Sequence, residues 1–194
     1  MKRSLIALAL SAILPLSAQA GEIGYSYIEG GYNRADFSDG NADGYFLDGS
    51  FAFNENFYGA ASYRKITNDD LGFDVSIDET TINLGYRHAV SDKADFIAEA
   101  GYVNIGFDVD GLGSDSSDGY RVAAGFRGML APKFEGNIKA YYTKVSDLGD
   151  GEFGARVGGV FHINQTWGVV ASYDHTKLFD EGINTWGLGV RASF

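Results

Sequence analysis

The chain has 194 residues, with 26 Asp and Glu against 15 Lys and Arg, and a formal net charge of −11 at pH 7. This length fits one domain, and the acidic balance argues against a nucleic-acid partner, which would need stripes of Lys and Arg. The lack of Cys excludes disulfides, thiolate metal sites and a Cys nucleophile, while 27 Gly, only 2 Pro and 14% aromatic residues favour short β-strands.

Residues 1–20 have the layout of a secretory signal peptide. A basic start at Lys2 and Arg3 precedes an apolar stretch that ends before the small-x-small pattern of Ala18 and Ala20. The alternative, a membrane anchor, is disfavoured because the apolar run is shorter than the ~20 residues of a spanning helix and contains Pro15. We expect a signal peptide over residues 1–20, recognised at Ala18 and Ala20, and one outer-membrane β-barrel domain over residues 21–194.

From residue 21 onward, short segments of alternating apolar and polar residues recur, as is typical of transmembrane barrels. In residues 184–194, for example, Trp186, Leu188 and Val190 share one face. The pattern predicts strands over residues 23–34, 44–53, 57–66, 78–89, 94–105, 119–129, 134–145, 152–162, 167–177 and 184–194.

The predicted connections alternate between tight turns and longer loops. The tight turns are residues 54–56, 90–93, 130–133 and 163–166, and they are rich in turn formers or contain Pro. Tight turns on the periplasmic side place both chain ends there as well. We therefore expect an all-β fold, a ten-stranded antiparallel up-and-down transmembrane β-barrel, with eight strands as the fallback.

The outward aromatic residues fall into two groups along the predicted barrel axis. Near the turns lie Phe53, Phe57, Phe96, Phe126, Phe134, Phe161, Trp167 and Phe194, and near the loops lie Tyr45, Tyr63, Tyr102, Tyr120, Tyr142, Tyr173 and Trp186. Amphipathic rings prefer the headgroup level of a bilayer, so two girdles of rings favour a membrane barrel over a soluble sandwich.

Charged residues of the predicted strands occupy the parity opposite to the apolar residues. They are Asp48, Arg64, Arg87, Glu99, Arg121, Arg127, Glu135, Lys139, Arg156, Asp174 and Arg191. A Lys or Arg facing lipid at mid-depth would cost ~2–4 kcal/mol, so we expect these side chains in the lumen. The first strand is ambiguous, and we place Glu29 inside, together with Tyr25 and Tyr27.

The arginines of this lumen set, Arg64, Arg121, Arg127 and Arg156, are expected to pair with Glu99, Glu135 and Asp48. Ion pairs of this kind would plug the narrow interior of a small barrel. We therefore expect a lumen closed to solute flow.

The last residues form a pattern of their own. Phe194 ends the chain, Gly189 stands five positions earlier, and Ala192 occupies a place where a bulkier residue is common. This resembles the C-terminal signal that the barrel-assembly machinery reads, so we expect that machinery to be a partner.

The segments 15–20, 25–32, 56–58 and 98–102 carry a resemblance that extends over essentially the whole chain. They resemble the xanthomonad outer-membrane family once described as a sulphation-dependent quorum factor and activator of rice receptor-mediated immunity. The resemblance implies an outer-membrane or vesicle location. It also places the family's proposed sulphated tyrosine at Tyr25, for which an ordinary strand tyrosine is the alternative.

We expect no catalytic residues and no cofactor. Ten-stranded barrels resemble the omptin proteases, but among the three His of this chain His88 and His162 stand beside periplasmic turns. His175 directly follows Asp174, which sends the two side chains to opposite faces. The omptin spacing of Asp-x-His is absent.

The predicted long loops hold 17 of the 26 acidic residues. They are Asp36, Asp39, Asp43, Asp69, Asp70, Asp74, Asp78, Glu79, Asp108, Asp110, Asp115, Asp118, Asp147, Asp150, Glu152, Asp180 and Glu181. Asp108, Asp110 and Asp115 lie among glycines as weak candidates for a metal site, but the order of a calcium loop is not met, and a solvated loop is the alternative.

These observations predict a non-enzymatic outer-membrane barrel with acidic extracellular loops and a structural or surface-interaction role. A narrow passive pore and an omptin-like or lipid-modifying enzyme are the alternatives. The expected partners are outer-membrane lipid, lipopolysaccharide and divalent cations, with the chain as a monomer.

Overall fold

The computed structural model describes residues 23–38, 40–68, 75–111, 113–146, 149–178 and 181–194. The predicted signal peptide, with Ala18 and Ala20, lies outside these ranges. The strands are β1 (Tyr27–Phe37), β2 (Gly40–Ala52), β3 (Phe57–Asn68), β4 (Val75–Ser91), β5 (Ala94–Val109), β6 (Gly113–Ala131), β7 (Phe134–Val145), β8 (Glu152–His162), β9 (Trp167–Leu178) and β10 (Glu181–Ser193).

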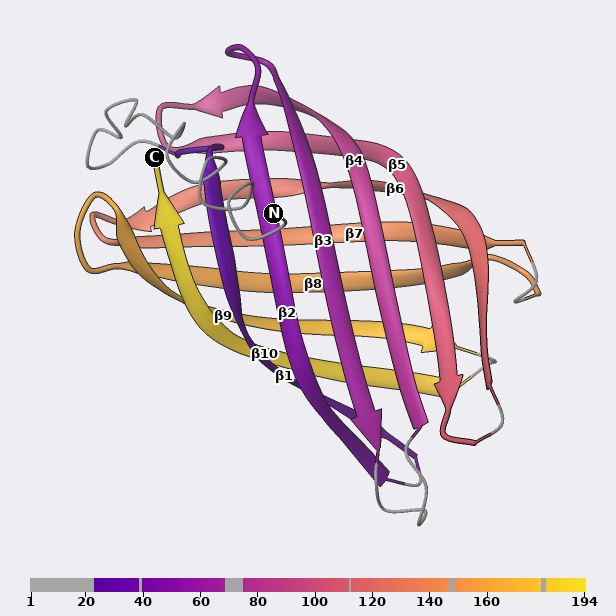
Figure 1. Ribbon diagram of the computed structural model, residues 1–194. Helices are drawn as coiled ribbons and strands as arrows, with labels where there is room; N and C mark the ends of the chain where they lie inside the picture. The colour runs from indigo at the N-terminus through magenta and orange to yellow at the C-terminus, as the bar shows by residue number, and fades with distance from the viewer. Residues whose placement is uncertain (1–22, 39, 69–74, 112, 147–148, 179–180) are drawn as a thin grey trace, which may run out of the picture.

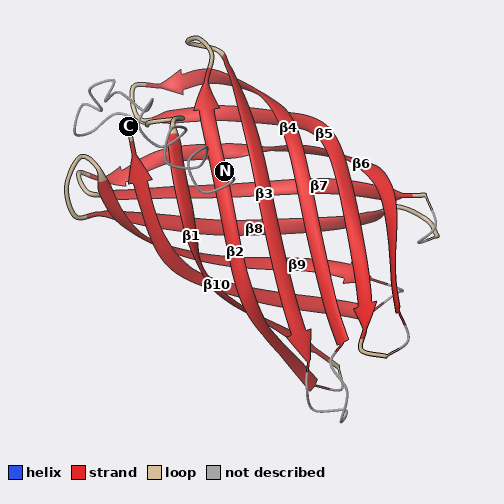
Figure 2. Ribbon diagram, in the orientation of Figure 1, coloured by secondary structure: helices blue, strands red, loops and turns tan. Residues whose placement is uncertain are grey.

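The strands form one closed antiparallel barrel (Figures 1 and 2). Each strand pairs with its neighbours in the chain, and β10 pairs with β1, with Glu29 opposite Arg191. Closure leaves no unpaired strand edge, which satisfies the backbone hydrogen bonds that lipid cannot. The prediction of ten strands in up-and-down order is confirmed. No helix of the described ranges has the length and hydropathy of a membrane span.

The two ends of the barrel differ. At one end, which we call the terminal end, the Phe194 amide donates to the Ser26 carbonyl at 3.1 Å. At this end tight turns join β2 to β3, β4 to β5, β6 to β7 and β8 to β9. Asn54 stabilises the first of these turns, because its side-chain oxygen accepts from the amides of Asn56 and Phe57, each at 2.9 Å. The positions of the four predicted tight turns are confirmed, but β4 extends to Ser91 and β6 to Ala131, so the turns predicted over residues 90–93 and 130–133 are shorter than expected.

At the opposite, distal end the strands run further than predicted. The segment 106–118 was expected as a loop, but Asp108 of β5 lies opposite Ser114 of β6, and the turn of the hairpin includes Asp110 and Gly111. Pairing continues past the apolar band because backbone hydrogen bonds do not depend on side-chain polarity. The expectation of a long loop was wrong here.

The alternation of inward and outward residues follows the prediction. On β1, Ile28 and Tyr32 are 43% and 50% exposed, whereas Glu29 and Asn33 are buried, which confirms the inward parity of the odd-numbered residues, and Tyr25, just before β1, is buried as well. Outward rings meet across neighbouring strands, including Tyr45 with Tyr63 near the distal end and Phe96 with Phe126 near the terminal end, at centroid distances of 6.0 and 5.6 Å.

Two inward tyrosines depend on glycines of adjacent strands. A Cβ atom at Gly85 would lie 2.2 Å from the Tyr58 ring, and one at Gly154 would lie 2.3 Å from the Tyr141 ring. Without side chains at these glycines, each ring lies flat across the neighbouring strand, and its hydroxyl reaches the middle of the lumen.

Because Phe194 directly follows β10, the strand that closes the barrel on β1, we predict that Phe194→Asp leaves export intact and lowers the amount of folded barrel in the membrane fraction. The measurement is the heat-dependent mobility shift of the protein on gels. The matched control is Phe134→Asp, which changes an outward ring near the same end of β7 but not the terminal pattern. An equal loss in both variants would contradict a terminal assembly signal.

Candidate functional site

The inward face of the barrel carries a terminal cluster of charged and aromatic side chains next to the tight turns. Its members are Tyr25, Tyr27, Glu29, Arg87, Asp95, Arg127, Glu135, His162 and Arg191. Glu135 is 1% exposed, and its carboxylate accepts from Arg127 Nε at 2.6 Å and Nη2 at 3.1 Å and from Arg191 Nη1 at 3.3 Å. Glu135 thus joins β7 to β6 and, across the lumen, to β10.

Arginines and tyrosines alternate in a stack within this cluster. The Arg127 guanidinium carbon lies 4.5 Å from the Tyr25 ring centre and 5.2 Å from that of Tyr27. Arg87 lies over the Tyr25 ring at 4.7 Å, and Arg191 over the Tyr27 ring at 3.8 Å. Cation–π contacts of this kind are strongest where water is excluded.

Tyr25 occupies the interior of the folded barrel. Its hydroxyl donates to Asp95 Oδ2 at 2.9 Å, its ring lies 4.9 Å from that of Tyr58, and only 4% of its surface is exposed. Burial raises the pKa of the Tyr25 phenol above its ordinary value, so the hydroxyl stays protonated and remains a donor. In the folded barrel the oxygen that sulphation would use is engaged with a carboxylate.

A central cluster fills the middle of the lumen. Its ion pairs are Arg64 with Asp48 at 3.5 Å, Arg121 with Glu79 at 2.6 Å, Lys139 with Glu99 at 2.8 Å and Arg156 with Asp174 at 2.9 Å. The two inward tyrosines complete it, because Tyr58 donates to Glu99 at 2.8 Å and Tyr141 to Asp174 at 2.5 Å.

The two clusters are balanced in charge. In the terminal cluster Glu29, Asp95 and Glu135 match Arg87, Arg127 and Arg191. In the central cluster four carboxylates match three guanidiniums and one ammonium group, pair by pair. Buried charges are tolerable when each has a partner and further hydrogen bonds, and these conditions are met by most of these groups.

The structure places every predicted lumen charge inside the barrel but changes several partners. Glu99 was expected to meet arginines, yet its partners are Lys139 and Tyr58. Glu79 was expected in a loop, yet both its oxygens accept from Arg121 inside the lumen, at 2.9 and 2.6 Å. Asp95, which was not among the predicted lumen charges, is buried and shares the parity of Glu99 on β5. That parity was the signal that could have revealed it.

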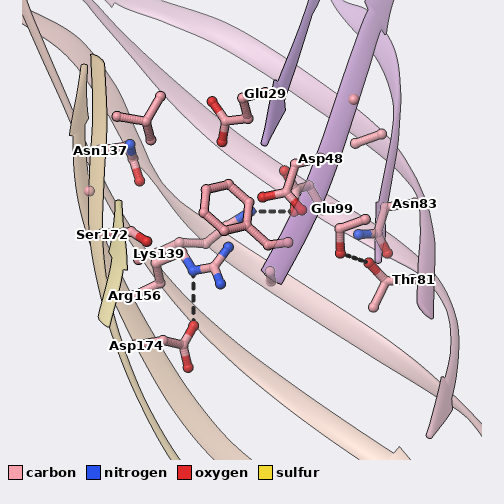
Figure 3. A pocket seen from close by; sticks show the side chains of 18 of the residues that line it. Glu29, Asp48, Thr81, Asn83, Glu99, Asn137, Lys139, Arg156, Ser172 and Asp174 are labelled. Carbon is pink, nitrogen blue, oxygen red and sulfur yellow. Dashed lines mark hydrogen bonds and ion pairs between the residues drawn. The ribbon is translucent and has the colours of Figure 1, made fainter. Parts of the chain in front are cut away.

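The residues that the structure describes line two cavities in the lumen. The central cavity, of about 140 Å³, is lined by both clusters, and Figure 3 shows Asp48, Glu99, Lys139 and Asp174 converging on it from different strands. The distal cavity, of about 150 Å³, lies between the central cluster and the distal end. Asn33 lines both cavities.

Acidic side chains dominate the distal end of the barrel. We call this set the distal rim, and its described members are Asp36, Asp43, Asp78, Asp108, Asp110, Asp115, Asp118, Asp150 and Glu152. Asp108 and Asp115 line one shallow pocket with Asp78 and Lys65, whereas Asp110 lies apart, at the hairpin tip. Within the described ranges no group of three or more His, Asp or Glu is placed to hold a metal ion.

The three histidines are far from forming one site. His162 Nε2 lies 3.4 Å from Glu135 Oε2 in the terminal cluster, and His88 is exposed near the turn after β4. His175 Nδ1 is 2.8 Å from Asn184 Oδ1 on the exposed face, while the neighbouring Asp174 points into the lumen.

Comparison with known proteins supports the fold. The model of the outer membrane protein beta-barrel domain family matches residues 6–161. No curated protein sequence matches this chain.

Several solved structures match this chain at low sequence identity. The attachment invasion locus protein Ail of Yersinia pestis is 18% identical with a TM-score of 0.45, and the similarity covers 89% of this chain and 100% of that chain. The translocator domain of the autotransporter NalP from Neisseria meningitidis is 12% identical with a TM-score of 0.51, covering 100% of this chain and 96% of that chain. OprG from Pseudomonas aeruginosa is 11% identical with a TM-score of 0.47, covering 91% and 100%. At 12% identity the likeness to the NalP translocator domain concerns the fold alone.

The geometry around Glu135 predicts a large effect on stability. Glu135→Ala leaves Arg127 without its carboxylate in a buried site, and we expect a loss of about 3–5 kcal/mol in the free energy of unfolding. Urea unfolding in lipid vesicles, followed by tryptophan fluorescence, measures the change. The control is Asp36→Ala, which removes an exposed ion pair with Arg34 and should leave the unfolding midpoint unchanged. Equal midpoints for Glu135→Ala and the native protein would mean that water reaches this cluster.

Proposed function

Because the chain belongs to the outer membrane protein beta-barrel domain family, we propose that it works as a non-enzymatic barrel with a closed lumen, whose distal rim faces the cell exterior and takes part in surface interactions. Its place is the bacterial outer membrane. The observation that carries the proposal is the pair-by-pair neutralisation of the lumen charges across strands. A lumen held together in this way stabilises the barrel and resists the passage of ions.

Contacts between strands that are not neighbours support the closed lumen. Arg191 of β10 reaches Glu135 of β7, and Lys139 of β7 reaches Glu99 of β5. Arg127 also donates to the Gly24 carbonyl at 2.8 Å, which fastens the segment before β1 inside the barrel. An ion crossing the lumen would have to displace these pairs and leave charges without partners.

Among the described residues, the candidate bases are already engaged, which supports a role other than catalysis. Asp174 is committed to Arg156 and Tyr141, and His175 lies on the other face of β9. His162 lies beside Glu135, whose oxygens already accept from two arginines. A general base must be free to take a proton at hydrogen-bond distance, and the carboxylates of Asp174 and Glu135 already accept from their arginine and tyrosine partners.

The distal rim supports a role in binding divalent cations at the cell surface. All of its members are carboxylates, which repel one another, and a divalent ion relieves the repulsion between several of them at once. Outward rings extend the rim, because the hydroxyls of Tyr32 and Tyr102 donate to Asp43 and Asp118. Lipopolysaccharide phosphates bridged by such ions are the partners we propose, with the barrel acting as a monomer.

The finer family relationship, to the xanthomonad quorum-factor group, also belongs to this proposal. The motifs around residues 25–32 and 98–102 support this relationship. It implies that the protein is also located in outer-membrane vesicles. In that case sulphation of Tyr25 must precede folding, because the folded barrel buries its hydroxyl against Asp95. A sulphate there would place a second anion beside that carboxylate.

The closed lumen predicts the electrical behaviour of the barrel. We expect no steady ion current from the native protein in planar bilayers, and a measurable current from the double variant Glu79→Ser with Arg121→Ser, which removes a matched pair from the centre. The control is Arg34→Ser with Asp36→Ser, which removes a rim pair and should stay silent. A steady current from the native protein would favour the alternative, a narrow passive pore.

The acidic rim predicts a weak effect of calcium. We expect protease cleavage at the β5–β6 hairpin, around Asp110, to slow with millimolar calcium relative to chelator, and magnesium to substitute in part. Replacing Asp108, Asp110 and Asp115 together by Asn should abolish the difference. Cleavage at Lys133, in a tight turn of the terminal end, serves as the internal control. The same cleavage rate with calcium and chelator would mean that these acids only solubilise the barrel.

A further inference from the structure

The distal cavity has an unusual lining for the lumen of a membrane barrel. Its apolar side chains come from β3, β4, β5, β7 and β10 and are Ile66, Ile77, Ile105, Val145 and Ile183. All of them occupy the inward parity of their strands, where a barrel in lipid normally places polar residues. Val145 and Ile183 are buried, and Ile66 lies directly opposite Ile77 in the sheet. We call this cavity the distal vestibule.

The floor of the distal vestibule is electrically satisfied. Arg121 uses both terminal nitrogens on Glu79 and its Nε on Thr143 Oγ1 at 2.7 Å. Asp174 accepts from Tyr141 and Arg156. A floor whose charges are matched in this way has little to offer a charged ligand.

One polar side chain in the wall of the vestibule, that of Asn33, has no hydrogen-bond partner among the described residues, unlike the charged groups of the floor. Asn33 is 2% exposed, and neither its amide nitrogen nor its amide oxygen has a hydrogen-bond partner in the described part of the chain. The residues opposite Asn33 in the sheet are Gly44 and Gly187, which have no side chains to meet it. A buried amide without partners costs free energy, so it favours a molecule that supplies a donor and an acceptor.

The mouth of the vestibule adds a selection by charge. Asp150, Glu152 and Lys177 line it, and Asp150 Oδ1 lies 3.9 Å from Lys144 Nζ. The two acids and two lysines balance in charge, so the entrance favours an uncharged molecule, in agreement with the neutral floor.

We propose that the distal vestibule is a binding site for a small uncharged amphipathic molecule, with an apolar body of about one ring and one hydroxyl or amide group. The apolar body lies against the isoleucines, and the polar group exchanges hydrogen bonds with Asn33. The size follows from the volume, because an apolar cavity of about 150 Å³ holds benzene. Ligand sites commonly combine such an apolar lining with a few placed polar groups. This site goes beyond the surface role proposed above, since it lies inside the barrel.

Isoleucine methyl groups provide the test. The refolded mature protein, labelled with ¹³C at isoleucine methyls, is placed in lipid nanodiscs and titrated with benzyl alcohol. We expect saturable chemical-shift changes at Ile66, Ile77, Ile105 and Ile183. The outward Ile82 and Ile138, both 58% exposed on the barrel surface, report partition into lipid and should not show a saturable change.

Substitutions test the polar part and the apolar part of the site separately. Asn33→Leu should weaken benzyl alcohol binding about fivefold, which corresponds to one hydrogen bond, without weakening toluene binding. Ile183→Phe, which fills the vestibule, should abolish the changes for both ligands. Benzoate, which has the same ring with a negative charge, should bind less tightly than benzyl alcohol.

Several results would overturn the proposal. One is the absence of saturable changes at the vestibule methyls, or equal changes at inward and outward isoleucines. Another is unchanged affinity for benzyl alcohol in Asn33→Leu, which would remove Asn33 from the site. Tighter binding of benzoate than of benzyl alcohol would contradict the uncharged ligand class.

Discussion

The ion pair between Arg127 and Glu135 is the contact on which the rest of the lumen depends. Arg127 lies between the rings of Tyr25 and Tyr27, binds Glu135 through two nitrogens and reaches the Gly24 carbonyl. The cost of removing this guanidinium from water is offset only when all of these partners are present. The segment before β1 is therefore coupled to the strands of the opposite wall, and barrel closure and burial of charge occur together.

Along the barrel axis, the lining of the lumen changes from paired charges to apolar side chains. The terminal and central clusters occupy the half next to the tight turns and the middle, and they leave the central cavity between polar groups such as Asp48 and Glu99. Beyond the central cluster the lining changes to isoleucine and valine. The same barrel thus combines a charged plug, which suits stability and closure, with an apolar chamber towards the distal end, which suits a small ligand.

Much of this architecture follows from alternation in the sequence. Within each strand a side chain faces lipid or lumen according to parity, and lipid does not tolerate charge, so the alternating pattern alone places Arg64, Arg121 and Glu135 inside. The strand ends were harder to locate. Acidic residues such as Glu79 and Asp108 resemble loop residues, because the strands continue beyond the apolar band that makes them recognisable.

The sequence by itself determined the number of strands, their parity and most of the charges inside, since these depend only on local periodicity and on the cost of charge in lipid. The tertiary structure alone decided which charges meet. Lys139 rather than an arginine binds Glu99, and Arg191 reaches Glu135 across the lumen, because barrel closure and strand tilt bring together residues of strands that are not neighbours. The same closure gathers Ile66, Ile105 and Ile183 around one space and leaves Asn33 between two glycines, which no pattern along a single strand reveals.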